Sequence, residues 1–413
     1  MTHIYIWIIS FLAIAGVITR PFKIAEAWWA ALGAGLLVVL GLITFGDGLA
    51  GIAKGANVYL FLTGMMLLAE TAREEKLFDW LAAHATRMAN GSANGLFLLI
   101  YLVGVVVTTF LSNDATAVVL TPAVAAAVRA AKVDKPLPYL FICAFIANAA
   151  SFVLPISNPA NLVIYGSHMP SLLHWLAQYL LPSFFAIAVT YIMLRFTQRG
   201  ALKAKIETDI TIPQLTQGGK TAIIGIAATA VILLIASALD IQLGLPTAVT
   251  GILTSAIVII RAKKNPWLVA KGVSWAVLPL VAGLFIIVEA LGKTGVITHL
   301  TTLLHENAAQ SVNATAWGSS IITAFACNLM NNLPAGLIAG NVVQGNVPEI
   351  IKSSVLIGID LGPNLSVTGS LATILWLVAL RREGLDVSFR TFLKLGALVM
   401  TVALVFALGA LWI

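Results

Sequence analysis

Four polar clusters interrupt long apolar runs in this sequence, and they hold the residues that could do chemistry. The clusters lie at 111–116, 155–161, 330–334 and 360–370. Their Asn, Ser and Thr side chains supply neutral hydrogen-bond donors and acceptors. Their Pro and Gly residues predict breaks in helices, and the backbone N–H and C=O groups freed at such breaks bind ions and polar solutes. We therefore predict a site that is rich in hydrogen bonds, poor in fixed charge and suited to a small polar solute.

The predicted site residues fall into three groups by their chemistry. Solute binding is expected from Ser112, Asn113, Asn158, Asn161, Asn331, Asn332, Thr368 and Ser370. Helix breaks are expected at Pro159, Gly362, Pro363 and Gly369. Proton coupling is expected from Asp114, Asp360 and Glu289, because ionisable groups inside apolar runs are costly and often form proton relays. A single Asn would more simply join two helices, but four clusters in two symmetric pairs favour a functional site.

Two acidic residues also have a simpler interpretation. Glu70 and Glu289 each lie near the end of an apolar run, where a carboxylate can reach interfacial water or cap a neighbouring helix. This interpretation is favoured for Glu70, because the charged residues 73–76 follow it. No Lys or Arg lies within any of the four clusters. A dicarboxylate or phosphate site would normally include one, so the sequence argues against such anions as the solute.

The elements that must position these clusters are membrane spans. Of the 413 residues, 60% are hydrophobic and 10% are charged, whereas a soluble domain carries about 25% charged residues. The net charge of +7 is therefore not read as a nucleic-acid signal, and the expected surroundings are a lipid bilayer. Cys143 and Cys327 lie in apolar runs without a CxxC pattern, so neither a disulfide framework nor a zinc site is expected. No cofactor is expected.

Ten apolar runs are predicted to cross the bilayer, which takes about 20 residues. They are 4–19, 24–45, 57–72, 137–165, 175–196, 219–238, 247–261, 274–291, 351–380 and 391–412. Two further apolar stretches, 94–128 and 312–345, are each interrupted by a polar cluster, and each is expected to form a re-entrant hairpin. In this arrangement every Lys and Arg except Lys54, Lys293 and Lys352 lies on one side of the membrane. Lys and Arg favour cytoplasmic loops, so both termini are expected outside.

The second half of the chain repeats the first half at an offset of 219 positions. Gly64 recurs as Gly283, and the pair 112–113 recurs as 331–332. The fourth polar cluster aligns with the second at an offset of 212. Each half holds five spans and one hairpin, and because five is odd, the two halves must enter the membrane from opposite sides. An internal inverted repeat with a site near the mid-plane is typical of secondary transporters.

The predicted fold is an all-α polytopic membrane protein made of two inverted repeats with broken helices at the mid-plane. The expected boundaries are 1–196 for repeat 1 (hairpin 94–128, broken helix 137–165), 197–218 for a polar cytoplasmic linker, and 219–413 for repeat 2 (hairpin 312–345, broken helix 351–380). Alternating access is the expected mechanism. The first three spans of each repeat would form a scaffold, with the Gly64 and Gly283 faces touching a moving core of hairpins and broken helices.

Three stretches resemble the arsenical pump membrane proteins, bacterial carriers that export arsenite and antimonite. They are 110–122, 330–334 and 358–376, and the last, which ends in Gly-Ser-Leu-Ala-Thr-Ile-Leu-Trp, is the most distinctive. The resemblance covers the whole chain. It implies proton-driven export of trivalent arsenic or antimony across the bacterial cytoplasmic membrane, by the carrier alone or with a soluble ATPase subunit. Arsenous acid is a small neutral tri-hydroxide, and Asn, Ser and Thr are suitable partners for it.

The sequence departs from that family at Ile359, the family also varies at 364–368, and other transporters stay open. Ile359 stands where some relatives carry a Cys before the aspartate, so a thiolate at that position is excluded. Cys143 and Cys327 are better interpreted as small buried residues than as arsenic ligands. The alternative is a sodium/proton antiporter or another small-ion carrier of the same superfamily, in which the Asn clusters would hold Na⁺.

Other classes of protein fit the sequence less well. A channel would not need inverted broken helices with tips from both faces. The six histidines lack metal-ligand spacing beside an acidic residue at membrane depth, so an enzyme is not expected. The chain has no Walker A motif, and any use of ATP would therefore come from a partner subunit.

Overall fold

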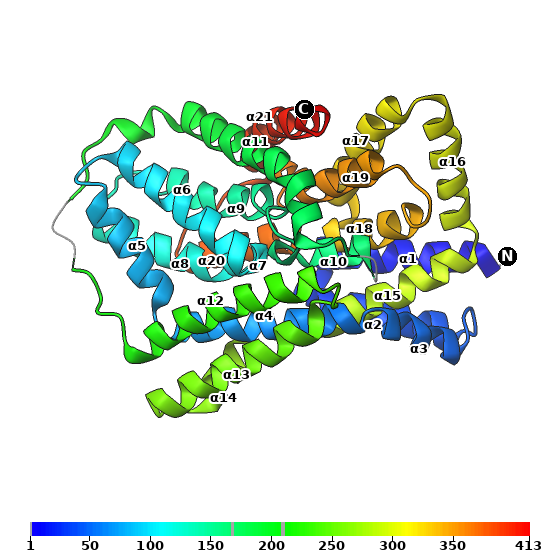
Figure 1. The fold of residues 1–413 in the computed structure, drawn as a ribbon, viewed down its shortest axis with the longest axis horizontal. Coiled ribbons are helices and arrows are strands. Elements are labelled where there is room, and N and C mark those ends of the chain that lie inside the picture. Colours follow the sequence, from blue (N-terminus) through cyan, green and yellow to red (C-terminus); the bar gives the residue numbers. More distant parts are fainter. Residues whose placement is uncertain (1, 167–168, 208–210) are drawn as a thin grey trace.

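The computed structural model describes residues 2–166, 169–207 and 211–413, and throughout these ranges the chain forms helices joined by short loops, without a β-strand (Figure 1). The expected all-α fold is confirmed. His168 and positions 208–210 of the predicted linker lie outside these ranges.

The helices of the first half run in a defined order. They are α1 (Thr2–Thr19), α2 (Glu26–Val39), α3 (Phe45–Lys54), α4 (Ala56–Glu74), α5 (Leu77–Met88), α6 (Ala93–Phe110), α7 (Asn113–Ala115), α8 (Thr121–Ala130), α9 (Leu137–Ala149), α10 (Pro159–Tyr165) and α11 (Leu172–Gln198). In order along the chain, these helices form two spans, a short helix, a third span, a connecting helix, a hairpin, a broken helix and a last span.

The second half follows the same order. Its helices are α12 (Gln217–Ala238), α13 (Gly244–Ala262), α14 (Pro266–Gly272), α15 (Val277–Lys293), α16 (Val296–Gln310), α17 (Val312–Met330), α18 (Asn332–Val342), α19 (Glu349–Leu361), α20 (Leu371–Arg382) and α21 (Phe389–Gly409). Hairpin 1 is formed by α6 to α8 and hairpin 2 by α17 and α18. Broken helix 1 is α9 with α10, and broken helix 2 is α19 with α20.

Length and composition alone do not separate spans from hairpin arms. Within the described ranges, seven helices are long and apolar enough to cross a membrane, or eight if α3 and α4, which meet at a bend of 49°, count as one span. One of the seven is α6, an arm of hairpin 1. Conversely, α2 and α9 are apolar but shorter than a full span. The polar breaks therefore define the architecture as much as the apolar runs do.

The packing partners exchange between the two halves, as inverted repeats require. Helix α4 lies along α13, and its counterpart α15 lies along α2. These contacts are close enough that a Cβ on Gly64 would meet the backbone of Thr247, and a Cβ on Gly283 would meet the backbone of Ala30. Small residues permit such close approach of helices in membranes. The expectation that these glycines touch the core is wrong, because both pack inside the scaffold.

The helices divide into a scaffold and a core. The scaffold contains α1 to α4 and α12 to α15, and the core contains the hairpins and broken helices. The last span of each repeat belongs to the core, because α11 packs along α21 and the two helices contact broken helices 1 and 2. In Figure 1, α4, α12 and α13 lie below α6, α9 and α20.

The two ends of the molecule carry different helices. Helices α5 and α14 lie toward one end, and α3, α16 and the N-terminus lie toward the other (Figure 1). Arg73, Arg129 and Arg381 fall in the last turns of α4, α8 and α20, whose loops are predicted to be cytoplasmic. Lys54 and Lys293 end α3 and α15 on the opposite side. The helix order is thus compatible with the predicted orientation in the membrane.

Candidate solute-binding site

Hairpin 1 turns at the first polar cluster. Ser112 caps α7, and its Oγ accepts a hydrogen bond from the Ala115 N–H at 3.3 Å. Asn113 Oδ1 accepts a hydrogen bond from the Asp114 N–H at 2.9 Å. Ser112 and Asn113 are buried, whereas Asp114 is half-buried. Capping uses one acceptor on each side chain and does not use the amide N–H groups of Asn113.

A π-helical turn, Thr116–Leu120, connects this tip to α8. Such turns are rare in helices and are often found at functional sites. The Thr116 hydroxyl lies 2.8 Å from the Thr108 hydroxyl on α6, so the two arms of hairpin 1 are joined just below its tip. The tip is therefore held in one geometry by hydrogen bonds within the hairpin.

Hairpin 2 turns at a single residue between its two helices. Asn331 has a φ of 74°, in the left-handed region that Asn tolerates better than most residues. Its Oδ1 accepts a hydrogen bond from the Leu333 N–H at 3.3 Å and so caps α18. Asn331 and Asn332 are both buried. The first polar residue of the pair caps the second arm in each hairpin, as the repeat predicts.

Broken helix 1 is interrupted at 150–158, directly before Pro159. Asn158 caps α10, and its Oδ1 accepts a hydrogen bond from the Ala160 N–H at 3.0 Å. Pro159 occupies the first position of α10, where a missing N–H costs little. Asn161 donates hydrogen bonds to the carbonyl groups of Ser151 at 2.9 Å and Pro155 at 3.3 Å. Its amide thereby satisfies backbone that the break has freed.

Broken helix 2 is interrupted at 362–370. Ser370 caps α20, and its Oγ accepts a hydrogen bond from the Thr373 N–H at 3.1 Å. Gly362 begins a short 3₁₀ turn, Gly362–Leu365, that includes Pro363. At Gly369 the backbone of Pro363 leaves no room for a Cβ. The predicted break residues thus lie at or beside the two observed interruptions.

Several hydrogen bonds join the broken helices to each other, and two of them involve the residues that cap the second half-helices. Asn158 Nδ2 donates to Asp360 Oδ1 at 2.6 Å, and Ser370 Oγ donates to Asn148 Oδ1 at 3.3 Å. Asp360 is completely buried, and within the described part of the chain its Oδ2 has no hydrogen-bond partner. An ionised carboxylate in that position would be costly. Asp360 Oδ2 is therefore the atom on which a proton, a cation or a solute hydroxyl would be held.

Each hairpin packs against the broken helix of the other repeat. The tip of hairpin 1 contacts α20, and α18 of hairpin 2 contacts α10. All eight predicted solute-binding residues therefore belong to the core. The Thr368 hydroxyl is already engaged, because its Oγ1 donates to the main-chain oxygen of Asn328 at 3.2 Å. Asp114 and Asp360 also belong to the core, whereas Glu289 lies on α15 of the scaffold.

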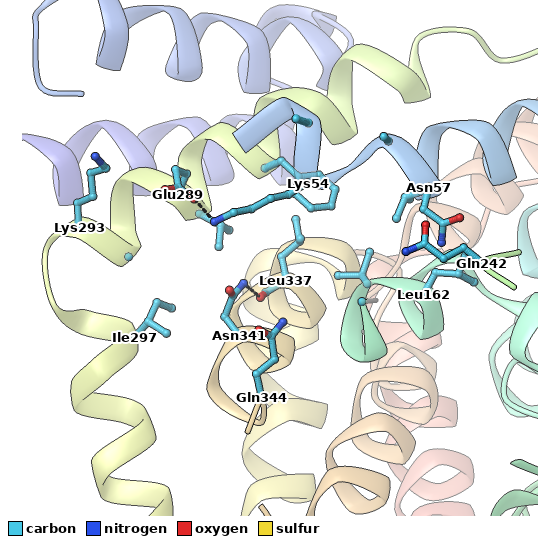
Figure 2. A pocket seen from close by; sticks show the side chains of 18 of the residues that line it. Lys54, Asn57, Leu162, Gln242, Glu289, Lys293, Ile297, Leu337, Asn341 and Gln344 are labelled. Atoms are coloured by element: carbon cyan, nitrogen blue, oxygen red, sulfur yellow. Dashed lines mark hydrogen bonds and ion pairs between the residues drawn. The ribbon is translucent and has the colours of Figure 1, made fainter. Parts of the chain in front are cut away.

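A cavity of about 620 Å³ separates scaffold from core on the side of α3 and α16 (Figure 2). Lys54 donates a hydrogen bond to Glu289 at 2.6 Å on the scaffold wall. Asn341 and Gln344 lie on the opposite wall, on and just after α18. Asp114 and Asp360 do not line this cavity. The structure therefore separates Glu289 from the other two coupling candidates.

The lysines at this larger cavity are neutralised. Lys293 also lines it and pairs with Asp47 at 2.6 Å, outside the membrane-spanning segments. The hydrogen bond from Lys293 lowers the pKa of Asp47 to about 2, below its usual value of 3.8, and the Thr44 hydrogen bonds add to this. Asp47 therefore stays ionised at neutral pH. Together with the Lys54–Glu289 pair, this leaves no excess positive charge from these lysines for an anion.

A much smaller cavity, of about 60 Å³, lies between scaffold and core near the opposite end. Glu70 on α4 and Asp114 and Ser112 of hairpin 1 line it, and the rest of its lining is mainly apolar. Glu70 is held by Arg73, whose Nη2 and Nε donate at 2.5 and 2.8 Å. Glu70 and Glu289, which are equivalent in the repeat, thus lie on the scaffold walls of the two cavities.

Three asparagines of the core were not among the predicted site residues. Asn148 donates to Asn364 Oδ1 at 3.0 Å, and Asn364 donates to the Phe145 carbonyl at 3.0 Å. Asn328 on α17 donates to the Gly362 carbonyl at 2.9 Å. The signal for them was available, since each is an Asn within or beside an apolar run, and Asn148 aligns with Asp360 at the offset of 212.

Comparison with known proteins places this architecture in a family. The CitMHS family, described as citrate transporter, matches residues 13–361. The arsenical pump membrane protein of Yersinia enterocolitica is 27% identical over 401 residues, covering 94% of this chain and 93% of that protein. The protein of the same name from Escherichia coli K12 is 27% identical over 412 residues, covering 96% and 95%. The resemblance to arsenical pump membrane proteins is confirmed over nearly the whole length.

A solved structure supports the fold. The crystal structure of the Alcanivorax borkumensis YdaH transporter is similar to this chain with a TM-score of 0.60 at 15% identity, covering 99% of this chain and 97% of its own. That likeness concerns the fold alone. Because the family match spans most of the sequence and the helices form a polytopic membrane fold, this chain belongs to the CitMHS family and is a membrane transporter.

Proposed function

We propose that this secondary transporter exports trivalent arsenic or antimony, as the neutral hydroxides, in exchange for protons. The observation that carries the proposal is the meeting of the broken helices, where amides and hydroxyls surround one fully buried carboxyl group, Asp360. A neutral tri-hydroxide both donates and accepts hydrogen bonds, and Asn and Ser side chains match both functions. The arsenical pump relatives support the same choice of solute.

Citrate, the solute in the family's description, fits this centre less well. A polycarboxylate taken out of water needs Arg or Lys partners to compensate its charge. Among the described residues, no ion pair or hydrogen bond joins a Lys or Arg to a predicted solute-binding residue. The neutral character of the centre therefore favours a hydroxide over a polyanion.

Asp360 is the proposed carrier of the exchanged proton. Its Oδ1 is occupied by Asn158, and its Oδ2 is buried without a partner. A bare carboxylate would be expensive to move through the membrane. The core is therefore proposed to cross with Oδ2 either protonated or accepting a hydrogen bond from a solute hydroxyl, and these two occupants would alternate. Asp114 is proposed to transfer the proton between this site and the smaller cavity.

The remaining predicted residues are proposed to surround the solute. Ser112 and Asn113 would contribute from hairpin 1 and Asn331 and Asn332 from hairpin 2. The helix caps Asn158 and Ser370, with Asn161 and Thr368, would contribute from the broken helices. Because each hairpin packs against the other repeat's broken helix, these groups are proposed to move together during alternating access.

The orientation predicted from Lys and Arg places the larger cavity outside and the smaller one on the cytoplasmic side. The structure would then correspond to an outward-facing state, with the inner pathway reduced to about 60 Å³. We propose that solute leaves through the larger cavity. The proposed location is the bacterial cytoplasmic membrane, where the carrier acts alone or with a soluble ATPase subunit.

Everted membrane vesicles from cells expressing the full chain would test this function. Uptake of arsenite and antimonite should follow an imposed proton gradient and stop when the gradient is collapsed, with or without sodium. The exposed loop variant Asp386→Asn is a control that should behave as wild type, since the Asp386 side chain is exposed and pairs with Arg381, outside the four polar clusters. Absence of uptake would refute the proposal. Uptake that requires sodium would instead support the sodium-linked alternative, and uptake of citrate would support the family's description.

A further inference from the structure

Asn328 links hairpin 2 to the break in α19 and α20. Its Nδ2 donates to the carbonyl group of Gly362 at 2.9 Å, and its Oδ1 accepts a hydrogen bond from the Ser366 hydroxyl at 2.7 Å. The same amide donates to Ala324 of its own helix at 2.8 Å. The main-chain oxygen of Asn328 accepts a hydrogen bond from Thr368 at 3.2 Å. One residue of the hairpin thus holds three positions of the break.

Repeat 1 stabilises its break differently. There the freed carbonyl groups accept hydrogen bonds from Asn161, which belongs to the broken helix itself. Thr109 stands at the position equivalent to Asn328. Its side-chain hydroxyl is buried and has no partner in the described part of the chain, and only its carbonyl oxygen accepts a bond, from Ser157 at 3.0 Å. Break 1 is therefore stabilised from within and by α11, where Trp175 donates to the Phe152 carbonyl group at 3.1 Å, whereas break 2 is stabilised from hairpin 2.

The backbones of hairpin 2 and broken helix 2 also approach closely. A Cβ on Gly358 would meet the backbone of Ser320, and a Cβ on Gly362 would meet the backbone of Ala324. Small residues at such a crossing let two helices pack backbone to backbone. The hydrogen bonds of Asn328 thus lie directly beside a tight contact. Displacing one helix would break the bonds and the contact together.

We propose that Asn328 is the residue that positions segment 366–370 against hairpin 2, so that hairpin 2 and broken helix 2 change conformation as one unit. Backbone groups freed from a helix at membrane depth must find hydrogen-bond partners within the protein. Here the partner of the Gly362 carbonyl group is Asn328, which belongs to hairpin 2. The positions of Ser366 and Thr368 are therefore determined by the hairpin. The coupling stands without the proposed function, whereas its consequence for solute binding depends on it.

The neighbouring thiol provides a direct test. Cys327 is completely buried, and its Sγ lies 3.5 Å from the Ile359 carbonyl oxygen, at the contact between the two elements. In a Cys143→Ser background it would be the single cysteine of the chain. The experiment measures the rate at which N-ethylmaleimide labels Cys327 in the purified full-length protein. In Asn328→Ala this rate should rise at least about tenfold, because the local opening that exposes the thiol becomes easier.

Further variants separate coupling from a general loss of stability. Asn307→Ala is the matched control, because Asn307 donates to the carbonyl group four residues earlier on an exposed face of α16 but contacts no break. Its labelling rate should equal that of the parent. Ser366→Ala removes the partner of Asn328 Oδ1 and should raise labelling by a smaller factor. The double variant should label at about the rate of Asn328→Ala, since the bond between Ser366 and Asn328 is already lost in that single variant.

The labelling rates of Cys327 test the coupling of hairpin 2 to broken helix 2 independently of which solute is transported. Unchanged labelling in both Asn328→Ala and Ser366→Ala, with intact folded protein, would overturn it. If Asn328→Ala does not fold, Ser366→Ala alone decides. In transport, Asn328→Ala should raise KM about tenfold with less than about a twofold change in maximal rate, as a loss of ground-state positioning does. Failure of arsenite transport in the parent would refute the proposed function and leave the labelling result valid.

Discussion

Asn158 donates a hydrogen bond to Asp360 across the two repeats, at 2.6 Å. The bond from Ser370 to Asn148 is the equivalent contact, because an offset of 212 relates Asn158 to Ser370 and Asn148 to Asp360. In each, the residue that caps one half-helix bonds the end of the opposite half-helix. Repeat 1 carries an amide at the position where repeat 2 carries a carboxyl. The symmetric contact therefore contains one ionisable group, which suits a carrier with one proton site at this centre.

Asp360→Asn should stop proton-driven uptake of solute while leaving the fold intact. The amide oxygen at 360 can still accept the hydrogen bond from Asn158, and the change removes a costly buried carboxyl group. The melting temperature of the purified variant should therefore stay within about 4 °C of wild type. In domains of about 150 to 250 residues, a shift of this size corresponds to a change of roughly 1 to 2 kcal/mol in the free energy of unfolding. Uptake in everted vesicles with and without a proton gradient measures the effect. Wild-type, gradient-dependent uptake would remove Asp360 from the coupling role.

Asp114→Asn should also stop coupled uptake. Asp114 is half-buried at the tip of hairpin 1 and lines the smaller cavity with Glu70, so its carboxyl group can exchange a proton with water that enters there. The substitution keeps the main-chain hydrogen bond to Asn113, which does not use the Asp114 side chain. The check is the same vesicle assay, with Asp386→Asn beside it. If this variant and the one at Asp360 both transport normally, neither acid couples transport to protons.

Glu289→Gln should retain proton-coupled uptake at more than half the wild-type rate. Glu289 is paired with Lys54 in the wall of the larger cavity, and its side chain is 20% exposed. A pair of this exposure contributes at most about 1 kcal/mol, so its loss should weaken the local wall without touching Asp360. Loss of coupling as complete as that expected for Asp360→Asn would return Glu289 to the coupling group.

The sequence allowed the helix order and the four polar clusters to be predicted, because both have local signals. Pro159 and the Gly362–Pro363 pair indicate breaks by themselves, and the runs between them are apolar. The bond between Asn158 and Asp360 could not be predicted, since it joins residues 202 positions apart through the packing of two repeats. The pairing of polar side chains with the freed carbonyl groups depends on the tertiary structure and has no local signal in the sequence.

Some features that were not predicted nevertheless have local signals in the sequence. Helix α3 starts at a capping box between Thr44 and Asp47, a local pattern that predicts a helix start. The apolar hairpin arm α6 passes the same length and composition test as a true span, so only its position before a polar tip distinguishes it. The recurrence of Gly64 as Gly283 indicated close packing but could not identify the partner helices.

Gly64→Ala should destabilise the protein, although Ala favours helices over Gly by about 1 kcal/mol. A Cβ at this position would collide with the backbone of Thr247 on α13, and overpacking of this kind costs about 1 to 3 kcal/mol. Gly35→Ala is the matched control, because nothing lies within 4 Å of a Cβ there. Thermal unfolding of both variants in detergent gives the comparison. Equal melting temperatures of the two variants would show that the contact between α4 and α13 can accommodate a Cβ at position 64, which would contradict the prediction.

Asn161→Ala and Asn332→Ala should separate a structural role from a role in binding. The Asn161 amide satisfies carbonyl groups of Ser151, Leu154 and Pro155, and leaving such buried groups unpaired costs about 1 to 3 kcal/mol. Asn161→Ala should therefore lower the melting temperature, and transport should fall mainly because less folded protein reaches the membrane.

Asn332 is also buried, but no other residue of the described chain hydrogen-bonds to its side chain. Under the proposed function, removing it should raise KM for arsenite and leave the melting temperature unchanged, because the Asn332 side chain is proposed to contact the solute and not the protein. Melting temperature and KM must be measured on both variants. Asn161 Oδ1 has no hydrogen-bond partner in the described structure. A higher KM with an unchanged melting temperature in Asn161→Ala would therefore mean that this oxygen binds the solute and that the Asn161 N–H groups add little to the stability of the break.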